Sequence, residues 1–441
     1  MVAQPENRPG TTLVPQSQRT RPGRGRATDR AARAAAFALL RRLRHGEIEI
    51  VEDGERHRFG SASGPAPLRA TVTLHGPAFY RALLSGGSSA LAWAYVDGAW
   101  DTDDATTLVR IGARNLGFQD NLRTALAPVL LPLQRGVHFF KRNTRARSAD
   151  NIHRHYDIGN DFFELMMDPT MQYSCGLYER PDMTLHEAQT AKLERACRWL
   201  RLAPDDHLLE IGTGWGGFAL YAAQNYGCRV TATTISREQY DYVARKIAAA
   251  GLQNRVTLVM QDYRDLSGRY DKLVHMEVIE SIGTQYLDRF LATCSRLLAP
   301  DGLMFVQAIV TGHRLYHFGR YNRGFASDVF PGGYLPSVTV ILDGIGRSTD
   351  MRPLQLEDIT PGYPTTLVAW RDNVDRNLDR VAAMGFDDRF LRMWRLYLSY
   401  CAGAFMERRI NDVQMLFAKP GFRDEQVRAD AVPALRELQR A

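Results

Sequence analysis

The sequence predicts an α/β fold in which a mostly parallel sheet carries helices on both faces, with a smaller α+β domain in front of it. Three observations lead to this prediction. Short apolar segments alternate with longer amphipathic ones from residue 208 to residue 309. A glycine-rich turn joins the first apolar segment to the helix that follows it. Further upstream, three short segments between residues 47 and 74 predict a sheet of their own.

The smaller domain is expected at residues 29–127. Its predicted elements are a helix at Asp29–Leu43, strands at Glu47–Glu52, Arg56–Gly60 and Leu68–Leu74, and helices at His75–Leu84 and Ala90–Val96. We expect Tyr95–Trp100 to form a turn with exposed aromatic side chains. Because no group of titratable residues in this region is typical of a catalytic site, the domain is predicted to pack, to dimerise or to present a substrate.

The larger domain is expected at residues 151–420, after a basic linker at 128–150. A helical stretch at Asn151–Met167 that breaks at Gly159, an irregular segment at Gln172–Tyr178 and a helix at Leu185–Leu200 lead into it. The alternating elements are Leu208–Ile211, Gly216–Tyr226, Arg229–Ile235, Arg237–Ala250, Val256–Gln261, Lys272–Met276, Tyr286–Leu298 and Leu303–Ile309. Residues 318–337 are rich in aromatics and predict a lid or the wall of a substrate tunnel. A helix at Asp387–Gly403 and a strand at Val413–Ala418 complete the domain, and residues 421–441 are expected to be a tail.

Composition is that of a globular protein, with 441 residues, 45% hydrophobic and 24% charged. No apolar run reaches the roughly 18 residues of a membrane span, and no signal sequence is evident, so we expect a cytoplasmic protein. The five cysteines are odd in number and widely spaced. This spacing predicts neither a disulfide framework nor a metal site.

Positive charge is concentrated in two stretches of a chain whose net charge is +7. Residues 1–44 hold ten arginines and two acidic residues, and a second basic run lies between Arg135 and Arg147. Such runs attract nucleic acid or anionic lipid headgroups, and a solvated tail and linker is the alternative. Residues 1–28 are rich in Pro, Gly, Gln and Arg, and we expect them to be disordered.

The glycine-rich turn predicts a ligand site, because Gly212 and Gly214 leave no Cβ in the way of a bound molecule. A dinucleotide is one candidate, since Gly217 can complete the spacing of that motif. Glu210 argues against it, because a carboxylate before the turn would repel a pyrophosphate but could hold an ammonium group. The second strand also lacks a terminal acid for a nicotinamide ribose. These features favour S-adenosylmethionine.

Ligands of such sheets lie beyond the carboxyl ends of the strands. Polar and sulfur-bearing residues expected at this edge are Glu210, Thr234, Asp262, Met276, Glu280 and Gln307.

From about residue 72 to residue 419 the chain resembles the cyclopropane fatty acid synthases and mycolic acid methyltransferases. The segments that carry the resemblance are Asp97–Trp100, His155–Asp157, Tyr173–Cys175, Glu210–Gly216, Thr234–Gln239, Gln261–Asp265, Phe330–Gly333 and Cys401–Phe405. The resemblance implies a class I, Rossmann-like S-adenosylmethionine methyltransferase domain behind a smaller N-terminal α+β domain. It also implies that the alkene of a phospholipid acyl chain attacks the cofactor's methyl group, after which a base removes a proton and a cyclopropane ring closes.

The cofactor is expected along residues 208–216, with contacts from Glu210, Gly212, Gly214, Trp215 and Gly216. We expect its ribose near Thr234 and Gln239 and its adenine near Asp262 and Tyr263, and Ser236 is a further expected contact of the cofactor. Its methionine end is expected near Tyr173 and Ser174.

The resemblance implies a bound bicarbonate ion as the base. Its shell is expected to comprise Cys175, the Met276 carbonyl, Glu280 and Tyr363, with Gln307 as a further donor. Cys401 matches a cysteine often named in the active site, and a buried structural thiol is the alternative interpretation. Many members have a histidine where this chain has Gln307. Together with the segment Met276–Glu280, this departure resembles a subgroup that includes plant-type synthases and enzymes that make mid-chain methyl-branched acids.

The expected partners are an unsaturated membrane phospholipid and an anionic membrane surface at its inner face, with no nucleic acid. A homodimer is compatible with the sequence, and a methylene-branched product would require a reductase partner. Two other functions are left open by the residues: an S-adenosylmethionine-dependent transferase on another lipid or small molecule, and a lipid- or cofactor-binding protein that has lost its chemistry. Gln307 is the only support for the last of these.

Overall fold

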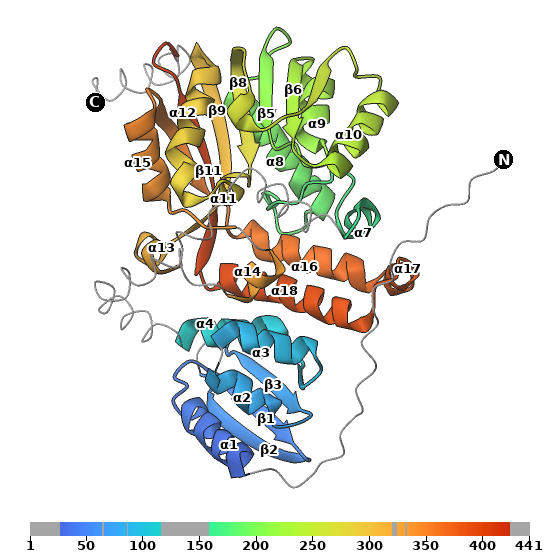
Figure 1. The fold of residues 1–441 in the computed structure, drawn as a ribbon, viewed down its shortest axis with the longest axis vertical. Helices are drawn as coiled ribbons and strands as arrows, with labels where there is room; N and C mark the ends of the chain where they lie inside the picture. The colour runs from blue at the N-terminus through green and yellow to red at the C-terminus, as the bar shows by residue number, and fades with distance from the viewer. Residues whose placement is uncertain are drawn as a thin grey trace, which may run out of the picture.

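The computed structural model describes residues 27–63, 66–85, 87–115, 158–319, 324–330 and 333–423. Two sheets lie one above the other in Figure 1, each with its own helices. The N-terminal tail up to residue 26, the basic linker, the motif His155–Asp157 and residues 424–441 lie outside the described residues. The predicted boundaries at 127/128 and 150/151 fall there too, so they stay predictions.

The larger sheet has seven strands in the order β10-β11-β9-β8-β5-β6-β7. Their bounds are His207–Ile211 (β5), Arg229–Thr234 (β6), Val256–Met260 (β7), Tyr270–Met276 (β8), Leu298–Thr311 (β9), Arg352–Asp358 (β10) and Ile410–Ala418 (β11). Five neighbouring strands, from β7 to β9, are parallel, as predicted, whereas β11 runs antiparallel to both of its neighbours. The alternation of the sequence therefore identified the parallel part of the sheet.

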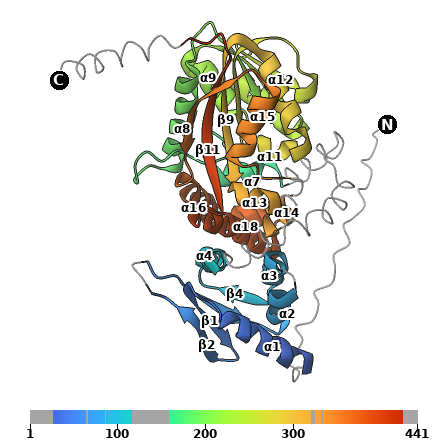
Figure 2. The same cartoon turned by 90° about the vertical axis from the view of Figure 1, so that its left-hand side faces the viewer.

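Helices cover both faces of this sheet, with a separate apolar core on each side. On one side lie α8 (Leu185–Leu200), α9 (Gly217–Tyr226) and α10 (Arg237–Ala249); on the other lie α11 (Ile279–Ile282), α12 (Leu287–Leu297) and α15 (Val338–Ser348). Local sequence starts α8, where Thr184 and Glu187 form a reciprocal capping box. Figure 2 shows α8 and α12 on opposite sides of β9 and β11.

The smaller sheet has the order β2-β1-β3-β4. Its elements are α1 (Ala27–Leu40), β1 (Gly46–Glu52), β2 (Glu55–Ser61), β3 (Arg69–Leu74), α2 (Ala78–Ser85), α3 (Gly87–Val96), β4 (Trp100–Thr102) and α4 (Ala105–Asn115). The predicted turn with exposed aromatics is wrong at Trp100, which is 2% exposed. The Trp100 indole donates to the Leu91 carbonyl at 3.0 Å. Strand β4 begins at Trp100, because Trp100 pairs with Leu74 of β3.

A layer of helices joins the two parts, as the middle of Figure 1 shows. It comprises α7 (Asn160–Met166), α13 (His313–Gly319), α14 (Phe325–Val329), α16 (Gly362–Asp375), α17 (Leu378–Ala383) and α18 (Asp388–Met406). Helix α18 packs on α3 and α4, and Arg392 on it donates to the carbonyls of Tyr95 and Trp100. Asp328 on α14 accepts from Ser89 and Trp93 of α3. The smaller domain thus contacts both α18 and the lid segment around α14.

Candidate active site

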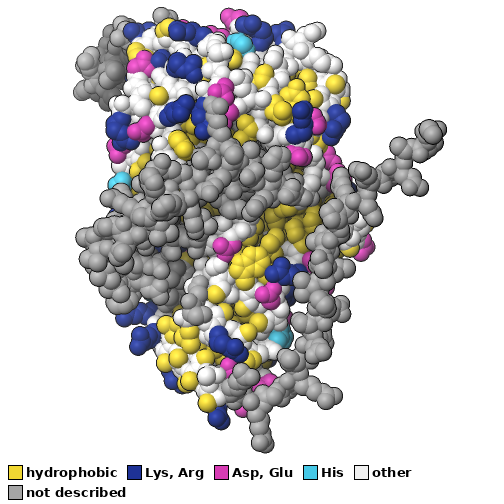
Figure 3. Space-filling model, viewed as in Figure 1, with side chains coloured by type: hydrophobic (Ala, Val, Ile, Leu, Met, Phe, Trp, Pro, Cys, Tyr) yellow, Lys and Arg dark blue, Asp and Glu magenta, His cyan; other side chains and the backbone are white. Residues whose placement is uncertain are grey.

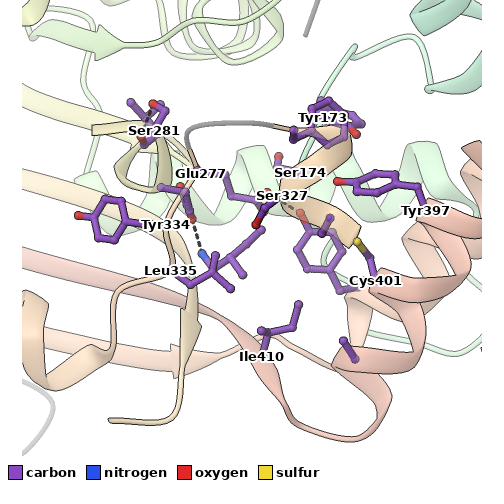
Figure 4. A pocket seen from close by; sticks show the side chains of 18 of the residues that line it. Tyr173, Ser174, Glu277, Ser281, Ser327, Tyr334, Leu335, Tyr397, Cys401 and Ile410 are labelled. Carbon is purple, nitrogen blue, oxygen red and sulfur yellow. Dashed lines mark hydrogen bonds between the residues drawn. The ribbon is translucent and has the colours of Figure 1, made fainter. Parts of the chain in front are cut away.

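A cavity of about 1010 Å³ opens at the carboxyl ends of the parallel strands and continues toward the smaller domain. Its wall includes the turn after β5, the ends of β6, β8 and β9, helix α18, and the faces of α3 and α4. Figure 4 shows how Glu277 from the end of β8, Tyr397 and Cys401 from α18, and Ile410 from β11 surround the same space. Residues far apart in the sequence therefore share one chamber.

The glycine turn borders this cavity, and its glycines serve different purposes. Gly214 has a φ of +56° and open space where a Cβ would stand, so a ligand can approach the backbone there. A Cβ on Gly212 would lie 2.6 Å from Val278, and one on Gly216 would lie 2.9 Å from Val243. A Cβ on Gly217 would lie 2.0 Å from the Thr170 carbonyl oxygen. Gly214 thus makes room for a ligand, whereas the others allow close packing.

Ten of the twelve predicted cofactor residues line the cavity. They are Tyr173, Ser174, Glu210, Gly212, Gly214, Trp215, Thr234, Gln239, Asp262 and Tyr263. The other two, Gly216 and Ser236, begin helices α9 and α10, and the Ser236 hydroxyl accepts from the Gln239 amide at 3.3 Å. Gly216 and Ser236 therefore lie outside the cavity lining, and their predicted contacts with the cofactor stay predictions.

Glu210 is buried at the end of β5, and its Oε2 accepts from the Thr213 hydroxyl at 2.6 Å. Burial raises the pKa of this carboxyl to about 7. At the end of the neighbouring strand β6, the Thr234 hydroxyl donates to Gln239 Oε1 at 2.9 Å, and after β7 Arg264 holds Asp262 through two hydrogen bonds of 2.6 and 2.7 Å. The cavity thus has an acidic group at the glycine turn and oriented polar groups at the ends of the next two strands.

Four of the six predicted catalytic residues line the cavity, namely Met276, Glu280, Tyr363 and Cys401. Gln307 does not: it is fully buried, and its Nε2 donates to Glu277 and to Asp412 at 2.9 Å each. Its Oε1 accepts from Gln414 at 3.1 Å. Protein acceptors therefore use both amide protons of Gln307, and its predicted role as a donor to a bound ion stays a prediction.

Cys175 also lies outside the cavity wall, with its thiol 3.3 Å from the Gly176 carbonyl oxygen. Burial raises the pKa of the Cys175 thiol well above its usual value. Cys401 faces the cavity, and burial raises the pKa of its thiol to about 12. Because a nucleophilic cysteine needs a lowered pKa, neither thiol is suited to attack a substrate.

Glu277 is the site residue that the sequence reasoning missed. It follows β8 with a φ of +53°, an uncommon conformation for a residue with a side chain, and it lines the cavity. Its Oε1 accepts from the Cys175 amide and from Gln307 Nε2 at 2.9 Å each, and its Oε2 accepts from the Tyr363 hydroxyl at 2.5 Å. A second carboxylate within the segment Met276–Glu280 was the signal that could have indicated it.

Glu280 is held at the same end of the cavity. Its Oε1 accepts from the Ile309 amide at 2.5 Å, and its Oε2 is buried without a partner among the described residues. Burial, followed by the charge of Glu277, raises the pKa of Glu280 to about 8. Behind both acids, Lys192 is fully buried and donates to the Ser174 hydroxyl at 2.6 Å. The chamber therefore ends on two adjacent carboxyl groups.

Aromatic rings form the rest of the chamber wall. Tyr173 stacks on Trp370 with 4.9 Å between ring centroids, and Phe330 contacts Tyr397 edge-on at 4.8 Å. Phe330 belongs to the predicted lid region, and the described part of that region does border the cavity. Phe318 and Tyr321 lie among residues whose side chains are outside the described set. Within the described ranges, no group of His, Cys, Asp and Glu could hold a metal ion.

The chain is similar to several known proteins. The sequence model of the mycolic acid cyclopropane synthetase family matches residues 143–415. The tuberculostearic acid methyltransferase UfaA1 of Mycobacterium tuberculosis is 33% identical over 405 residues, which cover 89% of this chain and 93% of the relative. The cyclopropane-fatty-acyl-phospholipid synthase of Escherichia coli K12 is 34% identical over 364 residues, 81% of this chain and 89% of the relative.

Among solved structures, mycolic acid cyclopropane synthase CmaA1 in complex with SAH and CTAB aligns with a TM-score of 0.57 and 29% identity. The alignment covers 62% of this chain and 98% of that one. The cyclopropane synthase MmaA2 of Mycobacterium tuberculosis aligns with the same TM-score and 27% identity.

Proposed function

The chain belongs to the mycolic acid cyclopropane synthetase family, and from this premise we propose that it adds a one-carbon bridge to the cis double bond of an unsaturated acyl chain in a membrane phospholipid. It is an S-adenosylmethionine-dependent methyltransferase with a Rossmann-like domain. The observation that carries the proposal is the single cavity that joins the glycine turn to an aromatic chamber ending on two carboxyl groups. The E. coli relative supports the substrate class, because its name specifies an acyl phospholipid.

The residues present fit the cofactor. S-adenosylmethionine carries an ammonium group and supplies an electrophilic methyl group when it is bound. The open space at Gly214 admits such a molecule beside the backbone, and the Glu210 carboxylate can pair with an ammonium group. The relative CmaA1, whose structure contains SAH, supports this assignment. Glu210 and Gly214 therefore hold the methionine end, and the polar groups around Thr234 and Asp262 face the rest of the cofactor.

Cofactor affinity should depend on pH through Glu210. Its raised pKa of about 7 means that the carboxyl takes up a proton as the pH falls through 7, and a neutral acid no longer attracts an ammonium group. We expect SAH, measured by isothermal titration calorimetry, to bind about tenfold more weakly at pH 5.5 than at pH 7.5. Glu210→Gln should bind weakly at both pH values. Equal affinity of the unaltered protein across this range would contradict the assignment.

The chamber suits an acyl chain that passes through a carbocation. Water would capture such a cation, so the reaction requires a wall that excludes water. The rings of Tyr173, Phe330 and Tyr397 provide this wall and can also stabilise the cation through their faces. Leu108, Val109 and Ala113 on α4 extend the apolar surface into the smaller domain. The smaller domain therefore contributes to the space in which the substrate chain would lie.

The bicarbonate ion implied by the sequence resemblance does not fit the described residues. The Cys175 amide, Gln307 and Tyr363 all donate to Glu277, so these donors are already used. Glu277 already places a negative charge at this point of the cavity wall, and that charge would repel a second anion. No step of the proposed reaction is therefore assigned to bicarbonate.

A second product is supported by one observation. The relative with the broadest coverage among those compared is named for tuberculostearic acid, and this supports methyl transfer that ends in a mid-chain methylene or methyl branch. Mass spectrometry of phospholipid fatty acids from cells that express the chain tests both products. A gain of one CH2 on monounsaturated chains supports the proposed function, and ring and methylene products differ in their fragmentation after derivatisation. An unchanged lipid profile would contradict it and favour a smaller substrate or a binding protein.

We also propose that the enzyme binds the anionic inner face of the membrane through its two basic stretches, residues 1–44 and 135–147. No helix in the described part of the chain is long and apolar enough to span a bilayer. We further propose that the chain forms a homodimer and that, if its product is branched, it acts together with a reductase.

Vesicle binding tests the membrane proposal. Each arginine near an anionic surface contributes about 1 kcal/mol, and salt screens the attraction. Replacing Arg8, Arg19, Arg21, Arg24 and Arg26 with glutamine should therefore weaken co-sedimentation with anionic vesicles, as should raising the salt. This variant leaves α1 intact, whereas deletion of residues 1–29 would remove Asp29, which pairs with Arg81 at 3.1 Å. If the protein binds neutral vesicles as well as anionic ones at every salt concentration, the proposal is wrong.

A further inference from the structure

We propose that the Glu277 carboxylate is itself the base that removes the proton at the end of the reaction. This inference rests on the function proposed above and deepens it, because it assigns a step of that reaction to a residue of this chain. It also implies that the unaltered enzyme needs no dissolved anion in its active site.

The convergence of hydrogen bonds on Glu277 carries the inference. Three groups expected to bind an anion all donate to its two oxygens: the Cys175 amide, the Gln307 amide and the Tyr363 hydroxyl. They come from positions 102, 30 and 86 residues away in the chain. The site therefore is a built anion site, and the anion in it is a side chain of the protein.

The backbone holds this carboxylate in place. Glu277 has a φ of +53°, which costs an ordinary residue on the order of 1 kcal/mol or more. Such a conformation persists only where the surroundings determine it. Here the Glu277 amide donates to the Gln307 carbonyl at 2.8 Å, which ties the residue to β9 as β8 ends. Both the main chain and the side chain of Glu277 are thus fixed, with the carboxylate in the cavity wall.

Of the three buried acids at this end of the chamber, Glu277 is the one best stabilised as an anion. Burial raises its pKa, but the Tyr363 hydroxyl, the Cys175 amide and the charge of Lys192 oppose that rise. Asp412 has one oxygen without a partner in the described chain, and burial raises its pKa well above the usual value. Glu280 has a pKa of about 8. The donors around Glu277 therefore favour its anionic form, which can accept a proton, whereas burial favours the neutral forms of Asp412 and Glu280.

The proposed step balances without any further reagent. After methyl transfer, the acyl chain carries a carbocation. A C–H bond of the added methyl group breaks, its electron pair forms the carbon–carbon bond that closes the ring, and the proton passes to an oxygen of Glu277. For a methylene branch, a hydride first shifts from the methyl-bearing carbon to the neighbouring cationic carbon, which moves the cation to the methyl-bearing carbon. The electron pair of the broken C–H bond then forms a C=C bond between that carbon and the added carbon, and the same oxygen takes the proton. Glu277 becomes a neutral acid and returns the proton to water when the product leaves.

Replacement of Glu277 by glycine tests this assignment, because glycine tolerates the positive φ and leaves the three donors around an empty space. Product formation from S-adenosylmethionine and unsaturated phospholipid vesicles would be measured in bicarbonate-depleted buffer. We expect the unaltered enzyme to work equally well with or without added bicarbonate. Glu277→Gly should lose at least about 100-fold in depleted buffer, as is typical when a general base is removed. Added formate or bicarbonate should restore part of this loss in a saturable way.

Asp53→Gly is the matched control, because Asp53 also has a positive φ, of 51°, and also carries a carboxylate, but lies in the exposed turn between β1 and β2. This control should keep full activity. If Glu277→Gly fails to bind SAH or to fold, Glu277→Gln should show the same loss without rescue by anions. Loss of wild-type activity on bicarbonate depletion, or full activity of Glu277→Gly in depleted buffer, would overturn the inference while leaving the proposed function intact. Absence of any lipid product from the unaltered enzyme would instead contradict the proposed function.

Discussion

Gly214→Val is expected to lower the affinity for S-adenosylmethionine at least about 100-fold, which corresponds to about 2.7 kcal/mol of binding free energy. Two effects act together. Valine is strongly disfavoured at the φ of +56° that this residue adopts. Its side chain would also fill the open space beside the backbone, where the cofactor is proposed to pass. Calorimetric titration with SAH measures the loss directly.

Gly54→Val is the control that separates backbone strain at a positive φ from the filling of the cofactor space. Gly54 likewise has a positive φ, of +85°, and open surroundings, but it lies in the turn between β1 and β2. Its substitution should lower thermal stability slightly and leave SAH affinity unchanged. If Gly214→Val binds SAH as tightly as the unaltered protein, the cofactor does not lie along this turn.

Trp394→Ala is expected to lower the free energy of unfolding of the larger domain by about 3–5 kcal/mol, as is typical when a buried tryptophan is truncated. Trp394 is fully buried on α18. Its ring lies 5.3 Å from that of Phe162 on α7 and 6.0 Å from that of Phe330 in the lid region, and its indole donates to Met166 sulfur at 3.2 Å. One side chain therefore connects three segments around the cavity.

Urea unfolding followed by far-UV circular dichroism tests this expectation, with the transition of the larger domain compared between variants. Trp199→Ala is the control, because Trp199 on α8 is only partly buried. It contacts Phe305 with 5.8 Å between ring centroids and should cost less than half as much when removed. A Trp394→Ala protein as stable as the Trp199→Ala protein would show that the three segments are held together by other contacts.

The cofactor side of the cavity could be predicted from the sequence because its features are local. Gly212, Gly214 and Glu210 lie within five consecutive residues, and a strand–turn–helix pattern places them together without help from the rest of the chain. The parallel strands were predicted for the same reason, since each strand between β5 and β9 is an apolar segment bounded by turn residues. Local backbone preference and apolar pattern therefore determined the fold class and the position of the proposed cofactor site.

The tertiary structure alone decided those elements whose conformation or burial depends on a neighbouring strand. Strand β10 is exposed along its whole length and shows no apolar period, so it becomes a strand only because β11 lies beside it. Trp100 is buried because β4 pairs with β3, which no local pattern indicates.

The end of the cavity at Glu277 and Glu280 shows most clearly what the sequence alone could not predict. The family resemblance predicts that Cys175, Gln307 and Tyr363 belong to one site, although they lie far apart in the chain. It did not determine where their protons point. Each donor bonds to the acceptor that folding brings nearest, and that acceptor is Glu277, at the end of the neighbouring strand. Competition among hydrogen-bond partners inside a packed core is a property of the assembled structure. For this reason the motifs predict which residues surround the proposed reaction site, whereas only the tertiary structure shows that their hydrogen bonds end on Glu277.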